Sequence, residues 1–215
     1  MMKRILLALF LLSSITVLSQ KKVMKQFQSS NDEINIYTSG LDNIILENSK
    51  SDFVEVILYA ESYDEQLIIV DQNKNQTDIK FHFEGTQTRE VIFRKFITKR
   101  LQRATATVKI PRNKKVFVFG ENVDIESKNH ENELAIYIEN GIVKLDTITS
   151  NVNLKLYSGN VFAFVKNTNL DVSSNNGTIK INQEISKNNI KKEDVNFDKN
   201  IIISTIKANI FLTTK

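Results

Sequence analysis

The sequence predicts an all-β, single-domain parallel β-solenoid with 18-residue rungs. Three turn dipeptides, Asn140-Gly141, Ser158-Gly159 and Asn176-Gly177, follow one another at a constant step of 18. Apolar residues on both sides of these turns keep the same step, and a constant period is the mark of a stacked repeat architecture. Short segments of alternating apolar and polar residues surround the repeat, and no segment shows a convincing helical period.

The apolar positions define two limbs for each rung, one before the turn and one after it. The matching positions include Leu134, Val152 and Leu170 before the turn, and Val143, Val161 and Ile179 after it. Alternation at period two places such residues on one face of a strand. Glycine after Asn or Ser supplies the positive φ that a tight turn needs. The clearest repeats therefore cover residues 134–181.

A second topology fits the same turns. Asn-Gly between two alternating strands is also a strong hairpin signal, which would give an antiparallel β-meander or sandwich. A meander needs no constant period, whereas a solenoid does, because like residues must stack on like. The period therefore favours the solenoid, and the meander or sandwich remains the alternative.

Residues 1–20 have the pattern of a cleaved signal peptide. Lys3 and Arg4 precede a short apolar segment, Ile5–Leu18, and Ser19-Gln20 stands before the polar Lys21-Lys22. This segment is shorter than the roughly 20 apolar residues that a membrane span needs. We expect an exported domain over residues 21–215, with no transmembrane span after cleavage, in the periplasm or on the cell surface. The absence of cysteine excludes a lipid-modified N-terminal Cys, so we do not expect a lipoprotein.

Strands are expected in close succession before the repeat. The alternating or apolar segments are 33–37, 44–46, 54–59, 67–70, 79–83, 105–110 and 116–119. Turn residues separate them, which indicates an all-β chain. Val116 and Val118 stand one such step before Leu134 and Ile136, so the repeat extends backwards in weaker form, with a solvated loop expected at Ser127–Asn132.

After Ile181 the period breaks. Residues 186–200 are rich in Lys and Asn, and we expect this polar insertion to loop out. Strand character resumes at Ile201, and Ala208-Asn209-Ile210-Phe211 echoes Gly159-Asn160-Val161-Phe162. We interpret this last segment as a closing rung.

Residues 89–103 are basic and interleaved with apolar residues. The candidates for contact with an anionic partner are Arg94, Lys95, Lys99 and Arg100. The alternative is a strand whose long basic side chains cover a sheet edge, a common device against edge pairing. The formal net charge of +4 falls to +2 without Lys3 and Arg4, which argues against a nucleic-acid partner.

Aromatic residues on the repeat form the second candidate partner surface. If Tyr137, Tyr157 and Phe162 point outward, they can stack on sugar rings or pack on a protein. The alternative is that neighbouring rungs or the 186–200 insertion cover them.

The sequence offers few residues for catalysis. His82 lies on the polar face of an alternating strand, and His130 lies in a polar loop, with no nucleophile-histidine-acid spacing at either. The acidic pairs Asp124/Glu126 and Glu131/Glu133 suit a solvated loop better than a calcium site. We therefore expect no catalytic residues, no resident metal, no cofactor and no enzymatic activity.

The exported start, the Ile110-Pro111 segment and the turns at Gly141, Gly159 and Gly177 resemble bacterial putative-adhesin β-solenoid domains, the toast-rack and head-GIN-like group of uncharacterised exported proteins. The likeness covers most of residues 33–212, although Ala208 replaces a turn glycine. It implies a non-catalytic binding or adhesion-type protein of the bacterial cell envelope. The partner would be an envelope protein, a glycan or a second copy of the chain. The alternatives are a periplasmic structural or sensory accessory protein and, third, an enzyme acting on envelope polysaccharide.

Overall fold

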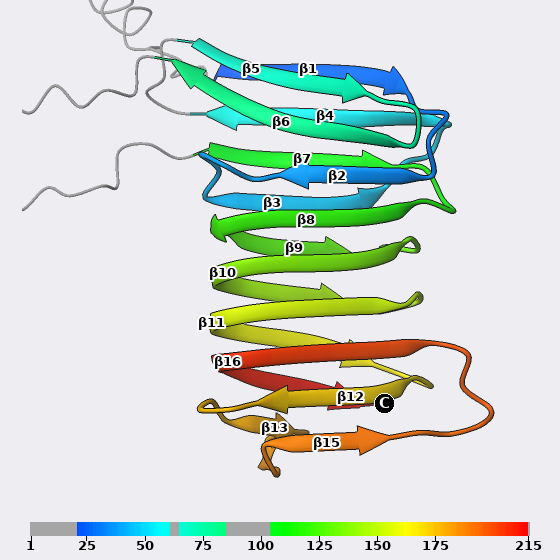
Figure 1. Cartoon of the computed structure of the whole chain (residues 1–215), viewed down its shortest axis with the longest axis vertical. Helices are drawn as coiled ribbons and strands as arrows, with labels where there is room; N and C mark the ends of the chain where they lie inside the picture. Colours follow the sequence, from blue (N-terminus) through cyan, green and yellow to red (C-terminus); the bar gives the residue numbers. More distant parts are fainter. Residues whose placement is uncertain (1–20, 61–64, 85–103, 215) are drawn as a thin grey trace, which may run out of the picture.

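The computed structural model describes residues 21–60, 65–84 and 104–214, and these residues are folded into 16 strands of one sheet. Figure 1 shows two layers of strands, one in front of the other, stacked along the long axis of the molecule. Three long strands bend and contribute a limb to each layer, which is how two layers belong to one sheet. The all-β prediction is confirmed, and there is no helix in the described residues.

The front layer, called the first face below, follows a simple order from one end of the stack to the other. Its strands are β5 (Glu65–Gln72), β6 (Gln76–Glu84), β2 (Glu33–Tyr37), β8 (Lys115–Asn122), the first limbs of β10 (Glu133–Asp146), β11 (Val152–Val165) and β16 (Asn200–Thr214), then β12 (Asn169–Ser174) and β15 (Asn189–Lys192).

The second face lies behind it and is built in the same way. Its strands are β1 (Lys21–Gln28), β4 (Phe53–Ala60), β7 (Ala104–Ile110), β3 (Asn43–Asn48), β9 (Asp124–Lys128), the second limbs of β10, β11 and β16, then β13 (Ile179–Ile181) and β14 (Glu184–Ile185). Antiparallel pairs occur only towards the two ends of the described stack, and its middle is parallel.

The 18-residue register is present in the middle of the stack. Leu134 pairs with Val116 on one side and with Val152 on the other, all in parallel strands. Val143 pairs in the same way with Ile125 and Val161. The parallel pairing excludes the antiparallel meander here, and it confirms the backward extension of the repeat.

The core fills the space between the two faces. The burial of β10 alternates along both limbs, so Leu134, Ile136 and Ile138 point inward from the first face and Val143 and Leu145 from the second. The pairing partners of these residues are also buried aliphatic residues along most of the stack. Each column of like side chains thus packs against its neighbours above and below, as the period requires.

The turn glycines lie where the strands bend from one face to the other. Gly159 has a φ of +130°, and a Cβ placed on it would overlap the carbonyl oxygen of Gly141. The same column contains Gly177, whose added Cβ would overlap the carbonyl oxygen of Ala208. These bends therefore bring backbones together. Gly141 and Gly159 form corners within the continuous strands β10 and β11, where hairpin turns were considered, whereas Gly177 lies between β12 and β13.

The last strand corrects the prediction of a closing rung. Ala208, Asn209, Ile210 and Phe211 pair with Gly159 to Phe162, the same residues that this segment echoes in sequence. However, β16 is inserted between β11 and β12, because its other edge pairs with β12 and β13. The stack instead ends at β15 and β14, and residues 152 and 170 are separated by one strand.

Two further expectations are wrong in part. Residues 186–200 do not simply loop out, because Asn189–Lys192 forms β15 and pairs antiparallel with β12. The segment Ser127–Asn132 is only partly solvated, since Ser127, His130 and Asn132 are buried whereas Asn129 and Glu131 are exposed. Both segments therefore contribute polar residues to the folded stack. The Lys191 and Lys192 side chains of the edge strand β15 are exposed, which hinders edge pairing.

Candidate binding surface

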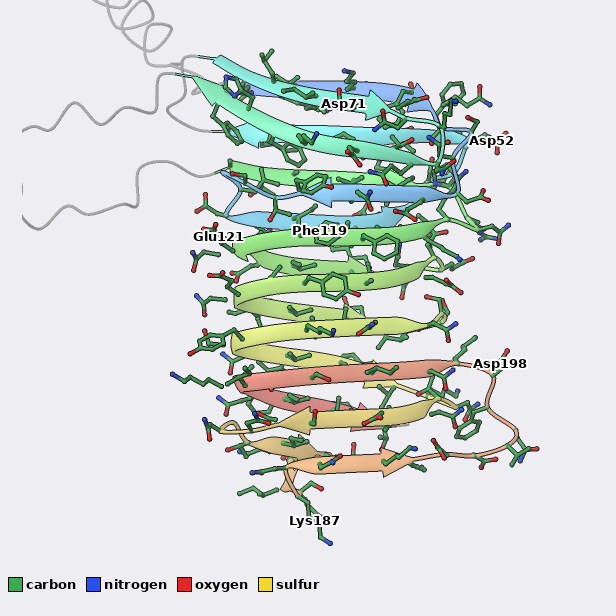
Figure 2. All side chains as sticks on the ribbon, in the orientation of Figure 1. Asp52, Asp71, Phe119, Glu121, Lys187 and Asp198 are labelled. Carbon is green, nitrogen blue, oxygen red and sulfur yellow. The ribbon has the colours of Figure 1, made fainter. Side chains whose placement is uncertain are left out.

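Outward side chains of the first face form an aromatic row that we call the Tyr137 ladder. The ladder consists of Lys80, Tyr37, Phe119, Tyr137 and Lys155, one from each of five neighbouring strands in register. Alternation places these residues outward because their sequence neighbours fill the core. Figure 2 labels Phe119 on the front of β8 and Glu121 at the side where the chain bends.

The rings of the Tyr137 ladder stack on one another. The ring centroids of Tyr37 and Phe119 are 5.4 Å apart and those of Phe119 and Tyr137 are 5.6 Å apart, with interplanar angles of 21° and 15°. The Lys80 and Lys155 ammonium groups lie 5.5 and 5.7 Å from the centroids of the end rings, Tyr37 and Tyr137. Neighbours therefore cover the ring faces, and the half-buried ladder presents mainly ring edges to solvent.

The second face carries a more exposed aromatic group, which we call the Phe162 surface. Its members are Phe162 and Phe164 of β11, Phe211 of β16, Lys144 of β10 and Lys180 of β13. The Phe162 and Phe211 centroids are 4.8 Å apart, and the Lys180 ammonium lies 5.9 Å from the Phe211 centroid. Phe162 and Phe164 are 41% and 47% exposed, so this surface has uncovered apolar area.

The three aromatic residues of the candidate partner surface, Tyr137, Tyr157 and Phe162, lie in three places. Tyr137 belongs to the first face and Phe162 to the second. Tyr157 is 48% exposed near the bend between them, with the Lys207 ammonium 5.3 Å from its ring centroid. Phe164 and Phe211 complete the exposed group around Phe162. Phe164 was not among the predicted surface residues, although period-two alternation with Phe162 places it outward. Only strand order brings Phe211 beside Phe162.

The remainder of the second face differs because its outward charges alternate. The row runs Glu55, Lys109, Glu47, Lys128 and Asp146 across five neighbouring strands. The Lys109–Glu55 and Lys128–Glu47 ion pairs measure 3.2 and 3.9 Å. Opposite charges are thus partnered within the sheet, and this row offers little net charge for a ligand.

The predicted basic surface of Arg94, Lys95, Lys99 and Arg100 lies outside the described residues. The acidic pairs are engaged with neighbouring groups. Asp124 Oδ1 accepts a hydrogen bond from the Ile142 amide at 2.8 Å, and Glu131 pairs with Arg112 at 2.9 Å. Within the part of the chain that the structure describes, no three His, Asp or Glu side chains gather as a metal site would require.

The two histidines have opposite environments. His82 is exposed on β6, in agreement with its predicted polar face. His130, expected in a solvated loop, is 3% exposed, and neither ring nitrogen has a hydrogen-bond partner among the described residues. Burial lowers the pKa of His130 from 6.5 to about 4, so the side chain is neutral near pH 7.

Comparisons with known proteins show the fold. No protein-family model matches the chain, and no curated protein matches it. The crystal structure of a putative cell adhesion protein from Clostridium sporogenes superposes with a TM-score of 0.63 at 11% identity, covering 92% of this chain and 100% of that one. The similarity establishes a shared fold. It agrees with the adhesin-type resemblance drawn from the turns.

Weaker structural matches carry related names. A putative adhesin from Parabacteroides merdae gives a TM-score of 0.36 at 10% identity, covering 91% of this chain and 79% of that one. A putative adhesin from Bacteroides fragilis gives 0.28 at 13% identity, covering 92% and 98%. The described residues contain no helix of the length and apolar character that a membrane span requires.

Proposed function

We propose that this chain is an exported, non-catalytic protein of the bacterial cell envelope that acts by adhesion-type binding. Three features support the proposal: the signal-peptide pattern of residues 1–20, the fold shared with the Clostridium sporogenes protein named for cell adhesion, and two long outer faces. Extended stacks of strands commonly serve recognition because they present rows of side chains at fixed spacing.

The Phe162 surface is the contact region in this proposal. Phe162 and Phe164 expose more than two fifths of their surface, and Lys144 and Lys180 flank the row in register. The edges of aromatic rings carry partial positive charge, and the ammonium groups add full charges. This combination favours a glycan with acidic groups, whose carboxylates meet the lysines and whose apolar ring faces pack on phenylalanine.

Binding to polysaccharides tests this assignment. The purified chain over residues 21–215 is titrated with alginate, an acidic glycan, and with dextran, a neutral one. We expect alginate to bind, and Phe162→Ala combined with Phe164→Ala to weaken it about tenfold, the equivalent of ~1.4 kcal/mol. The matched control is Leu67→Ala with Ile69→Ala, which removes two exposed side chains, 40% and 39% accessible, from the distant β5.

Equal loss of binding in both double variants, or equal binding to dextran, would contradict the Phe162 surface as an acidic-glycan site. Thermal melting of each variant confirms that the fold is retained. Protease treatment of intact cells then addresses location. Digestion of the chain on intact cells supports an adhesin at the surface, whereas protection until the outer membrane is opened supports a periplasmic accessory protein.

A further inference from the structure

β16 separates two strands, β11 and β12, that the 18-residue repeat would place next to each other. Leu154 and Val172 are one 18-residue step apart, as Ile136 and Leu154 are, yet they are not neighbours in the sheet. Ile203 of β16 lies between them and pairs with Leu154 on one side and Val172 on the other. The repeat thus continues in the sequence across a junction that the structure fills with a strand from the end of the chain.

The residues at the corners keep the 18-residue sequence step even though β16 lies between two of the strands that carry it. Glycine occupies this column at positions 141, 159 and 177, whereas β16 supplies Ala208. A polar column beside it contains Asn122, Asn140 and Ser158, where Asn140 Nδ2 donates to Asn122 Oδ1 at 3.4 Å and Ser158 Oγ donates to Asn140 Oδ1 at 3.0 Å. Asn176 stands at the next step of 18, but Lys207 of β16 lies against Ser158.

Direct pairing of β11 with β12 and β13 preserves the inward and outward faces of every strand. In the 18-residue register, Val152 meets Leu170, Leu154 meets Val172, and Val161 meets Ile179. All six side chains are buried apolar residues, and a slip by one residue would have reversed their faces. The sequence therefore encodes two compatible neighbours for the β11 edge, namely β16 and the limb that begins at Asn169.

We propose that the chain has a second conformation in which β16 leaves the stack and β12 and β13 pair directly with β11 in the 18-residue register. The inserted state is the ground state, because β16 buries Ile201, Ile203, Ile210 and Leu212 and pairs along both edges. Release keeps the sheet continuous, since one strand contact replaces two. The freed β16 is then an apolar strand with two unpaired edges, the form that adds to another chain.

The connection to β16 permits this exchange. Residues 193–199 join β15 to β16 as the loop at the right of Figure 1, with Asp198 labelled in Figure 2. Val195 is fully exposed, and Asn169 anchors the loop by accepting from the Asp194 amide at 2.8 Å and donating to the Phe197 carbonyl at 3.1 Å. The Asn169 amide also donates to the Lys199 carbonyl at 2.8 Å, and the Asn200 amide donates to Asn151 Oδ1 at 2.9 Å. Release of β16 must therefore break this set of hydrogen bonds as well as the strand pairing.

Cysteine pairs distinguish the two states without ambiguity, because the chain contains no native cysteine. Lys155 pairs with Ser204, and Ser204 pairs with Ser173, so Lys155 and Ser173 are two strands apart when β16 is inserted. Adjacent strands lie about 4.8 Å apart, within reach of a disulfide, whereas strands two apart are beyond it. A Lys155→Cys/Ser173→Cys disulfide can therefore form only in the second conformation.

The matched control is Asn122→Cys/Ser158→Cys, two positions separated by Asn140 in a part of the stack with no alternative register. Lys155→Cys/Ser204→Cys reports the inserted state. Under mild oxidation of the folded full chain, we expect Lys155→Cys/Ser173→Cys to form an intramolecular disulfide about tenfold faster than the control. Equal rates for these two pairs would overturn the proposal.

A substitution in β16 tests the direction of the equilibrium. Ile203→Asn places an amide in the core position between Leu154 and Val172, which penalises insertion. It should raise the yield of the 155–173 disulfide and lower that of the 155–204 disulfide. Lower yields of both in a chain that still melts cooperatively would contradict the exchange. If this variant does not fold, the comparison in the unaltered background decides the question.

Discussion

The buried histidine is the residue with the clearest electrostatic consequence. His130 lies in the connection between β9 and β10, where its main-chain carbonyl accepts a hydrogen bond from Thr149 Oγ1 at 3.3 Å. Burial desolvates the ring, which disfavours its charged form, and this desolvation is the cause of the lowered pKa. Protonation of this ring therefore lowers the free energy of unfolding.

Stability should fall as the pH is lowered from about 6.5 to about 4. The unfolded chain binds a proton on His130 near its ordinary pKa of 6.5, whereas the folded chain binds it only near 4. The unfolded state thus holds more protons in this window, and the free energy of unfolding decreases by up to about 3 kcal/mol. Urea unfolding at several pH values measures this. His130→Leu should flatten this dependence, and an unchanged dependence in that variant would contradict the assignment to His130.

Gly159 should tolerate no side chain. Its φ of +130° disfavours β-branched residues, and an added Cβ would overlap the Gly141 carbonyl oxygen. Gly159→Val should lower the free energy of unfolding by about 3 kcal/mol or more, since the obstacle is backbone on a neighbouring strand. Denaturant unfolding is the measurement, with Ser158→Ala as the neighbouring control. A loss below ~1 kcal/mol would show that the corner relaxes.

At the scale of elements, each strand is stabilised by outward rows as well as by the core. The Tyr137 ladder joins β6, β2, β8, β10 and β11, and the alternating charges join strands of the second face. Such rows form because identical strand spacing repeats the same side-chain geometry from strand to strand. They also reduce the number of ring faces available to a ligand.

Phe119 and Tyr137 should be energetically coupled. Their rings stack at 5.6 Å across the β8–β10 pair, and stacked aromatic pairs contribute about 0.5–1.5 kcal/mol beyond area burial. A double-mutant cycle with Phe119→Ala and Tyr137→Ala, measured by urea unfolding, should give a coupling in that range. The same cycle on Phe119 and Tyr157 is the control. Coupling near zero for the stacked pair would show that the ladder adds no stability.

For the whole molecule, strand pairing on both edges distinguishes the middle of the stack from its ends. β10 and β11 are paired on both sides over two limbs, whereas β15 and β14 pair on one side only and are four and two residues long. Opening of a terminal strand breaks one interface, while opening of a middle strand breaks two. Local stability is therefore expected to be highest in the middle of the stack and to fall towards its ends.

Amide hydrogen exchange should follow that gradient. We expect the slowest exchange in β10 and β11 and the fastest in β14 and β15, with at least about a hundredfold difference in protection factors, equivalent to ~2.7 kcal/mol. Mass spectrometry of peptides from the folded chain measures it. Equal protection along the stack would indicate a single cooperative unit with no local opening of its end.

Much of the strand pattern is local information. Alternation and the step of 18 identified inward residues such as Leu134, Ile136 and Val143, and their partners in the register are the predicted ones. The aromatic candidates were only partly predictable. Sequence spacing marks a side chain as outward, but it does not say which strand lies next to it, and so Phe211 was missed beside Phe162. The burial of His130 was also missed, because the adjacent residues Asn129 and Glu131 are polar and exposed and so give no local sign that the fold buries the ring between them.

The sequence by itself determined the all-β class and favoured the parallel register of the middle strands, because a period of 18 makes like residues stack on like. The structure excluded the antiparallel meander there and showed that Gly141 and Gly159 form corners within continuous strands. Only the tertiary structure decided the place of β16. Its residues match the β11 edge as well as those of β12 and β13 do, so periodicity cannot rank the two neighbours. The strand order β11–β16–β12 is favoured because it pairs β16 along both edges and buries its isoleucines. This stabilisation depends on the whole stack.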